Sequence, residues 1–108
     1  MSKLPVVELL YVEGCPNQEP ALALVERVAA ELRVAPRIEV VEVADAGAAV
    51  ALRFLGSPTV RIDGHDVEPG ADERREFALS CRVYQTGSGL TGRPDEAWIR
   101  EALTEIGR

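Results

Sequence analysis

The residue of this chain best suited to covalent chemistry is Cys15, which follows an apolar run and directly precedes Pro16. A proline here is typical of the first turn of a helix, so Cys15 is expected where a strand gives way to a helix. Gln18 stands where a second cysteine would complete a Cys-x-x-Cys pair, and the other cysteine of the chain is Cys81. The sequence therefore predicts one attacking thiol without a neighbouring thiol to resolve it.

A thiol at the start of a helix favours its thiolate form, because free backbone N–H groups and the helix dipole stabilise a negative charge. The thiolate is the species that attacks a disulfide. We therefore expect Cys15 to act as a nucleophile. The alternative is a partly buried loop cysteine in a domain that has kept its fold and lost the chemistry.

A mixed disulfide on Cys15 must be released by a second thiol, which would be glutathione, another small thiol or Cys81. An internal disulfide needs the two Cα atoms within ~7 Å of each other. Free cysteine is among the most buried residue types, so packing in the core is the other interpretation of Cys81. Arg82 would favour a Cys81 thiolate, yet neighbouring residues of a strand point to opposite faces.

Length and composition indicate a single domain over residues 1–108, with 46% apolar and 28% charged residues as in ordinary soluble proteins. The net charge of −6 argues against nucleic acid or acidic membranes as partners. Two cysteines and the single His65 are too few for a protein metal cage, and no cofactor is expected.

The expected location is the cytoplasm, where reducing conditions keep thiols free. The sequence has no run near the ~20 apolar residues that span a bilayer, so no membrane contact is expected. Its first residues lack the long apolar stretch of a secretory signal.

The elements that must position the cysteines alternate between strands and helices. Apolar, β-rich runs predict strands over Val6–Val12, Ile38–Val43 and Thr59–Ile62. The dipeptide Asp63-Gly64 predicts a hairpin turn, so His65–Val67 should return as an antiparallel partner.

Helical spacing of apolar residues predicts three helices. They are one from Pro16 or Pro20 to Arg33, a short one over Ala46–Phe54 capped by Asp45, and a last one opened by Pro94-Asp95-Glu96 with Ile99, Ala102, Leu103 and Ile106 on one face. The charged run Glu68–Glu76 is expected to be an exposed loop, and Phe77–Tyr84 is either a strand or irregular. The order is βαβαββα with an extra loop before the last helix, an α/β class with helices on both faces of the sheet.

This order, together with two short motifs, resembles the thioredoxin-like fold from Val6 to about Val67 and in the last helix. The motifs are Gly14-Cys15-Pro16-Asn17 at a strand-to-helix turn and Gly56-Ser57-Pro58-Thr59-Val60 before a strand and a hairpin. The resemblance implies a three-layer thioredoxin-like sandwich in which a cis bond precedes Pro58 and Pro58 faces Cys15 across a groove. It also implies a bare backbone edge at Ser57, free to pair with an extended substrate.

More closely, the runs GCPN, FLGSPTVRIDG and LSCRVY look like small bacterial thioredoxin-family proteins of the DF type, whose members can have selenocysteine. Some such proteins are labelled alkylmercury lyase. This chain is short for such a lyase, and the lyase's cysteine and aspartate constellation is not evident in it.

The resemblance implies a thiol-dependent redox protein, either a disulfide oxidoreductase or a glutathione-linked monothiol protein. Cys15 would be the nucleophile and Cys81 a resolving thiol, with glutathione or a protein disulfide as substrate. The residues expected to contact substrate are Pro16, Asn17, Ser57, Pro58 and Thr59, and Asn17 is also expected to cap the local backbone.

Two other functions stay open. One is a non-catalytic thioredoxin-like module that binds a partner chain by strand pairing near Pro58. The other is a protein that binds mercury or another soft metal between Cys15 and Cys81, because thiolates select soft metals.

Overall fold

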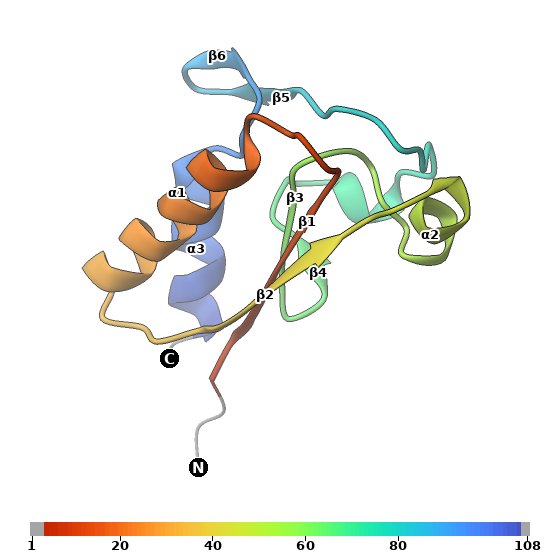
Figure 1. The fold of residues 1–108 in the computed structure, drawn as a ribbon. Coiled ribbons are helices and arrows are strands. Elements are labelled where there is room, and N and C mark those ends of the chain that lie inside the picture. Colours follow the sequence, from red (N-terminus) through yellow and green to blue (C-terminus); the bar gives the residue numbers. More distant parts are fainter. Residues whose placement is uncertain (1–3, 107–108) are drawn as a thin grey trace.

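A computed structural model describes residues 4–106 as a mixed α/β domain with a four-stranded sheet, a two-stranded hairpin and three α-helices (Figure 1). The strands are β1 (Val6–Tyr11), β2 (Arg37–Glu42), β3 (Thr59–Ile62), β4 (His65–Asp66), β5 (Tyr84–Thr86) and β6 (Gly89–Thr91). The helices are α1 (Gln18–Glu31), α2 (Ala46–Ala51) and α3 (Glu96–Ile106), with a 3₁₀ turn over Ala71–Glu73. The predicted α/β class is confirmed.

The sheet has the strand order β2-β1-β3-β4, with β1 parallel to β2 and the pairs β1–β3 and β3–β4 antiparallel. Helix α1 connects the parallel pair, because parallel neighbours require a crossover. Asp63 and Gly64 connect β3 to β4 with φ of 50° and 86°, the positive values that a type I′ hairpin turn needs. The predicted hairpin is therefore confirmed, although its second strand ends at Asp66 and not at Val67.

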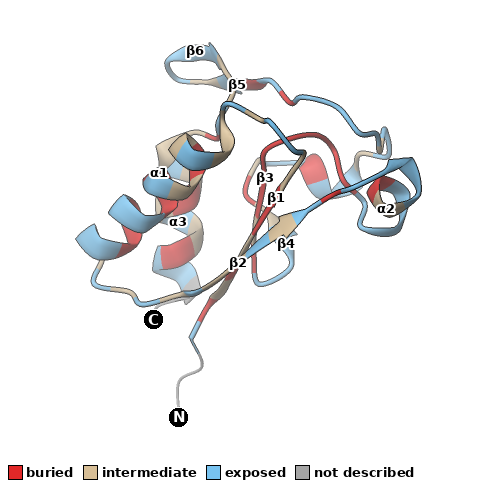
Figure 2. Cartoon of the chain, viewed as in Figure 1, coloured by how far each residue is buried: buried red, intermediate tan, exposed pale blue. Residues whose placement is uncertain are grey.

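The central strand β1 is covered on both faces, because successive side chains of a strand point to opposite sides. Val7 and Leu9 are fully buried in a cluster with residues of α1 and α3. Leu10 lies in a second cluster with Ala49 and Phe54. Two helices thus cover one face of the sheet and α2 covers the other, and Figure 2 shows the continuous burial of the segment that leads into β3.

Helix α1 begins between the two predicted starts. Its first α-helical bond joins the Ala21 N–H to the Asn17 carbonyl at 3.0 Å, so Asn17 is the N-cap residue. Pro20 lies in the first turn, where its missing N–H removes no helical bond.

Helix α2 is shorter than predicted and stops before Phe54. Arg53 takes a left-handed φ of 55°, and the Phe54 N–H then donates to the Ala49 carbonyl at 2.8 Å. This is the usual way a helix ends, although the left-handed residue here is an arginine and not a glycine.

The segment before α3 is more structured than the predicted extra loop. Residues Tyr84–Thr86 and Gly89–Thr91 pair as the antiparallel hairpin β5–β6. Tyr84 is fully buried at the base of this hairpin, with its ring centroid 6.1 Å from that of Trp98. A buried aromatic anchor therefore holds the hairpin against the domain.

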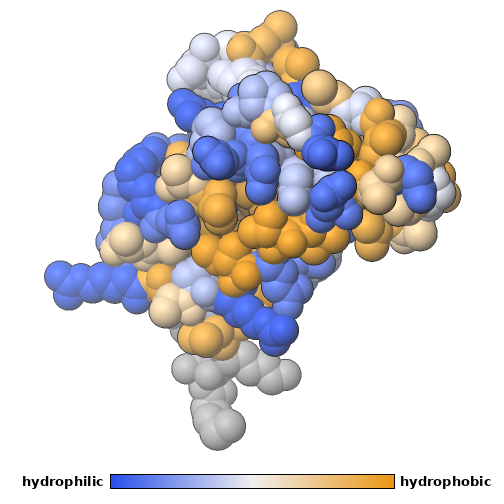
Figure 3. Space-filling view, in the orientation of Figure 1, coloured by the Kyte–Doolittle hydropathy of each residue, from blue (hydrophilic) through white to orange (hydrophobic). Residues whose placement is uncertain are grey.

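The surface of this domain is divided into a charged part and a more apolar part. Arg27 and Glu96 form an exposed ion pair at 2.7 Å between α1 and α3, and hydrogen bonds from Arg27 and then Arg100 lower the pKa of Glu96 to about 2. On the face seen in Figure 3, apolar side chains gather over the edge strand β2 and over α2, where Val40 and Val50 are exposed.

Among the described residues, no helix is both long and apolar enough to cross a bilayer.

Replacing Leu9 with alanine should lower the free energy of unfolding by about 2–5 kcal/mol, because the side chain is fully buried between the sheet and two helices. Leu90→Ala is the matched control, since Leu90 is 71% exposed and should change the free energy of unfolding by no more than about 0.5 kcal/mol. Urea unfolding followed by circular dichroism measures both. Equal losses in the two variants would contradict this core.

Candidate functional site

Cys15 lies in the turn between β1 and α1. The Cys15 N–H donates to the Val12 carbonyl at 3.1 Å, and Gly14 has a φ of 79° at the third position of this turn. A positive φ at that position strongly favours glycine, which explains Gly14. Cys15 is half-buried and its thiol is free, and the residue precedes the N-cap Asn17 of α1 by two positions.

Pro16 and Asn17 form a second turn, which the Gln18 N–H closes by donating to the Cys15 carbonyl at 3.4 Å. Asn17 is the N-cap by position, but its side chain makes no capping hydrogen bond within the described part of the chain, so the capping prediction is wrong. The side chain instead contacts Gly92, where an added Cβ would lie 2.2 Å from the Asn17 Nδ2 atom. Asn17 therefore packs the end of the β5–β6 hairpin against the start of α1.

The second predicted motif lies next to this turn. The Val12 N–H donates to the Ser57 Oγ at 3.0 Å, and the carbonyl of the same Val12 accepts the bond from Cys15. Ser57, Pro58 and Thr59 are buried, and the Ser57–Pro58 peptide bond is cis, as the resemblance implied. The structure thus joins the two motifs through the backbone of Val12.

The backbone edge at Ser57 is occupied, so the prediction of a bare edge is wrong. The Ser57 N–H donates to the Ser80 carbonyl at 2.8 Å, and the Arg82 N–H donates to the Ser57 carbonyl at 2.9 Å. These bonds pair Ser57 with Cys81 in a parallel bridge. A buried backbone group needs a hydrogen-bond partner, and the chain supplies one itself through Ser80–Arg82, which we call the strap.

Gly56 permits the close approach of the strap. Its φ is 129°, and an added Cβ would lie 2.9 Å from the Cβ of Arg82 and 3.2 Å from the carbonyl oxygen of Cys81. Both the backbone conformation and the space therefore require glycine.

The strap is fixed by Arg82, which is only 3% exposed. Its Nη1 donates to Asp66 at 2.8 Å and to the Thr59 hydroxyl at 3.0 Å, and its Nη2 donates to Glu68 at 2.7 Å. Burial alone would lower the pKa of Arg82, but the hydrogen bonds from the guanidinium to Asp66 and Glu68 outweigh it and raise this pKa above its ordinary value. Arg82 is thus a fully charged clamp between the strap and β4.

Tyr84 extends this clamp toward the hairpin. The Arg82 guanidinium lies 4.4 Å from the centre of the Tyr84 ring, a cation–π distance. Burial raises the pKa of Tyr84 above its ordinary value, so its hydroxyl stays protonated and donates to the Pro58 carbonyl. Sequence reasoning missed this network. The available signal was an arginine inside the largely apolar run FALSCRVY, in a chain that also has Asp66 and Glu68 around the predicted hairpin.

Cys81 is exposed, so its interpretation as a core residue is wrong. Arg82 points away from it into the ion-pair network, as strand alternation predicted. Cys81 lines a cavity of about 370 Å³. The other lining residues are Val12, Glu13, Glu42, Val43, Ala44, Leu79 and Ser80. Two carboxylates therefore border the cavity that opens at this thiol.

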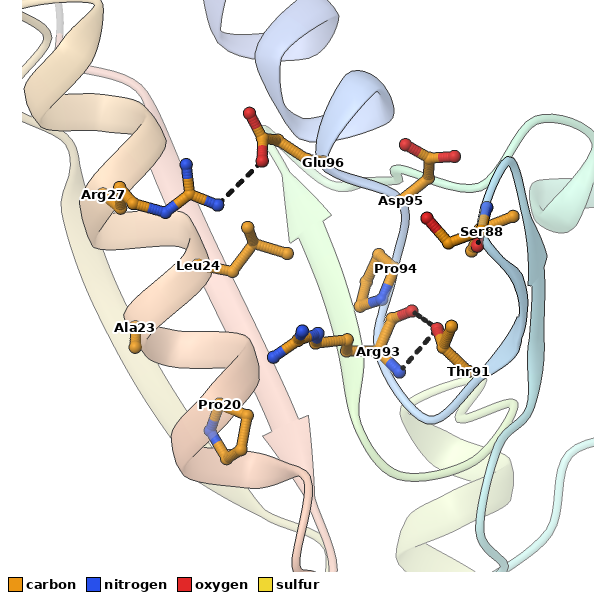
Figure 4. A pocket seen from close by; sticks show the side chains of 11 residues that line it. Pro20, Ala23, Leu24, Arg27, Ser88, Thr91, Arg93, Pro94, Asp95 and Glu96 are labelled. Carbon is orange, nitrogen blue, oxygen red and sulfur yellow. Dashed lines mark hydrogen bonds and ion pairs between the residues drawn. The ribbon is translucent and has the colours of Figure 1, made fainter.

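A larger cavity of about 490 Å³ lies between α1, the β5–β6 hairpin and the start of α3 (Figure 4). Arg93 points into the space beside α1, while Arg27 pairs with Glu96 at 2.7 Å. Asp95 accepts bonds from the N–H groups of Gly87 and Ala97. This cavity is lined by none of the predicted site residues, so it lies apart from the thiols.

Metal ligands are not clustered in the described residues, where no three His, Cys, Asp or Glu side chains come together as a metal site requires. His65 is exposed, and its Nδ1 lies 3.1 Å from a carboxylate oxygen of Asp72. A soft-metal site would therefore depend on the two thiols alone.

Comparison with protein-family models finds no match to this chain, and comparison with curated proteins finds none either.

Replacing Arg82 with methionine should lower the free energy of unfolding by about 3–5 kcal/mol, because the Asp66 side chain is 4% exposed and would lose its partner. A double variant that also carries Asp66→Leu should recover much of this loss, since removing both charges of a buried pair is close to neutral. Urea unfolding measures all variants.

Arg74→Met is the matched control, because Arg74 also pairs with Glu68 but is 39% exposed. The free energy of unfolding of this variant should fall by less than about 1 kcal/mol. A similar loss for the Arg74 and Arg82 variants would contradict the clamp.

Proposed function

We propose that this chain is a thiol–disulfide oxidoreductase of thioredoxin-like fold, with Cys15 as the attacking thiol and Cys81 as the resolving thiol. The observation that carries the proposal is the series of hydrogen bonds that links the segments of the two cysteines. The Cys15 N–H bonds to Val12, the Val12 N–H bonds to Ser57, and Ser57 pairs with Cys81. Two free thiols therefore flank one end of the sheet.

The reaction begins when the Cys15 thiolate attacks one sulfur of a disulfide RSSR. A Cys15–SR mixed disulfide forms and one RS⁻ leaves. The Cys81 thiolate then attacks the Cys15 sulfur, forms the Cys15–Cys81 disulfide and releases the second RS⁻. Two glutathione thiols reduce this internal disulfide and leave as oxidised glutathione, so electrons pass from glutathione to RSSR.

The strand order and helix placement support the thioredoxin-like assignment. Parallel β1 and β2 joined by α1, the antiparallel β3–β4 hairpin and a last helix packed beside α1 agree with that fold. A cytoplasmic location fits the proposal, because a reducing compartment keeps both thiols ready to react.

A soft-metal site is the second candidate. Cys81 is exposed and pairs with Ser57, and Ser57 is bonded to Val12 of the Cys15 turn. Stoichiometric protection of both thiols by Hg²⁺, with no turnover of a disulfide, would favour it over the redox function. A binding module that uses the Ser57 edge has less support, since the strap occupies that edge.

Cys15→Ser should lose the fast reaction with 2-hydroxyethyl disulfide and form no internal disulfide, because the attacking sulfur is gone and only the exposed Cys81 can still react, more slowly. Cys81→Ser should accumulate the mixed disulfide on Cys15, because the resolving thiol is gone, whereas the unmodified chain should pass on to the internal disulfide. Intact-mass spectrometry after acid quenching separates these species. An undiminished rate in Cys15→Ser would remove Cys15 from the mechanism, and no internal disulfide in the unmodified chain would remove Cys81.

Glu13→Gln should raise the rate of reaction with oxidised glutathione about two- to threefold at low salt, because Glu13 follows Val12 at the turn and repels a negatively charged substrate. The increase should fall away near 0.5 M salt, where charges on a surface are screened. Glu26→Gln, an exposed change farther along α1, is the control and should leave the rate unchanged. Equal rates in all three proteins would show that the carboxylate at the turn does not act on the substrate.

A further inference from the structure

The strap fills the position at Ser57 where a polypeptide would add by strand pairing. Both main-chain groups of Ser57 are bonded to the strap. Its N–H donates to the Ser80 carbonyl at 2.8 Å, and its carbonyl accepts from the Arg82 N–H at 2.9 Å. An extended peptide recognises a sheet edge through such main-chain groups. An incoming chain would have to displace the strap before it could form these two bonds.

Displacement is costly because the strap is not held by these two bonds alone. Arg82 places a guanidinium in a site that is 3% exposed, between the carboxylates of Asp66 and Glu68. Moving the strap outward would separate this buried ion pair and leave Asp66, with a side chain 4% exposed, without its partner. The strap is therefore a fixed part of the site.

The strap leaves both thiols at least partly exposed to small molecules. Cys81 is exposed and borders the cavity of about 370 Å³, and Cys15, which does not line this cavity, is half-buried. A low-molecular-weight disulfide needs no main-chain pairing to reach a sulfur. The obstacle thus acts on polypeptides only.

From these observations we infer that the substrates of this site are low-molecular-weight disulfides and not extended polypeptides, and that Arg82 is the residue that sets this specificity by holding the strap. The inference rests on the proposed function and names its substrate class. Arg82 is a positioning residue, since its side chain anchors the strap to Asp66 and Glu68 and takes no part in the sulfur chemistry.

The test compares two substrates that share one reactive bond. The first is N-acetylcysteine amide joined to 2-mercaptoethanol by a disulfide, and the second carries the same disulfide at the centre of an extended ten-residue peptide. A free sheet edge would favour the peptide about tenfold or more, from two added backbone hydrogen bonds. The unmodified chain should react with the peptide no faster than with the small disulfide.

Loosening the Arg82 clamp should change the ratio of the two rates, that with the peptide divided by that with the small disulfide. Asp66→Asn keeps the shape of the side chain and removes its charge, and Arg82→Gln shortens the clamp. In either folded variant, the peptide should gain at least about threefold relative to the small disulfide. Arg74→Met, which leaves every contact of Arg82 intact, is the control and should keep the original ratio.

Amide hydrogen exchange provides a readout that does not depend on thiol chemistry. The Ser57 and Arg82 amides should exchange slowly in the unmodified chain and at least about tenfold faster in Asp66→Asn, because both amides donate within the strap pairing. Rapid exchange of these amides in the unmodified chain would show that the strap is not a fixed part of the site.

The substrate class would be overturned if the unmodified chain preferred the peptide tenfold, or if a loosened strap left the ratio of the two rates unchanged. Reaction of Cys15 with neither substrate would instead overturn the proposed function, together with the substrate class, and leave slow amide exchange standing for the strap.

Discussion

The buried ion pair between Arg82 and Asp66, at 2.8 Å, is the interaction on which the rest of the site depends. It ties the strap to β4, and its guanidinium also reaches the Thr59 hydroxyl at the start of β3. Tyr84 stacks on the guanidinium and reaches Pro58, which links the same network to the β5–β6 hairpin. A single arginine thus holds three segments that are far apart in the sequence, and desolvation makes the loss of either charge expensive.

Val12 connects the Cys15 turn to Ser57, as Arg82 connects the strap to β4. It follows the last residue of β1, where the chain has left the sheet but has not begun α1. Its carbonyl closes the turn that holds Cys15 and its N–H holds the Ser57 hydroxyl, so both of its polar groups serve the site. Groups at the carboxyl end of a central strand are well placed for function, because there the sheet is rigid and the loops are free to vary.

Elements with strong local chemistry could be predicted from the sequence. The strand Thr59–Ile62 was predicted with the same bounds, and Asp63-Gly64 specified its turn, because two adjacent residues decide that geometry. The end of α2 was missed because Arg53 takes a left-handed conformation in which glycine would be expected, so the sequence carries no stop signal there.

The site was predictable only in part, for the same physical reason. Cys15 and Ser57 were singled out because each belongs to a short local motif. The strap escaped prediction because its pairing with Ser57 joins residues more than twenty positions apart through an irregular segment, with no periodicity to reveal it. An arginine is also ordinarily a surface residue, and only the partners at Asp66 and Glu68 make its burial possible.

Because Arg82 forms an ion pair with Asp66 and not an apolar contact, it also fixes the register of the strap against Ser57. Side chains of an extended segment alternate, so a shift of the strap by one residue would turn Arg82 out to solvent and bring Cys81 or Val83 to face two carboxylates. Cys81 and Val83 are both exposed, whereas Arg82 between them is 3% exposed. An apolar residue in place of Arg82 would tolerate such a slip, because apolar contacts are not directional. A guanidinium that must meet Asp66 and Glu68 at once does not tolerate it, so the charge network fixes Cys81 opposite Ser57 and thereby determines where the second sulfur stands.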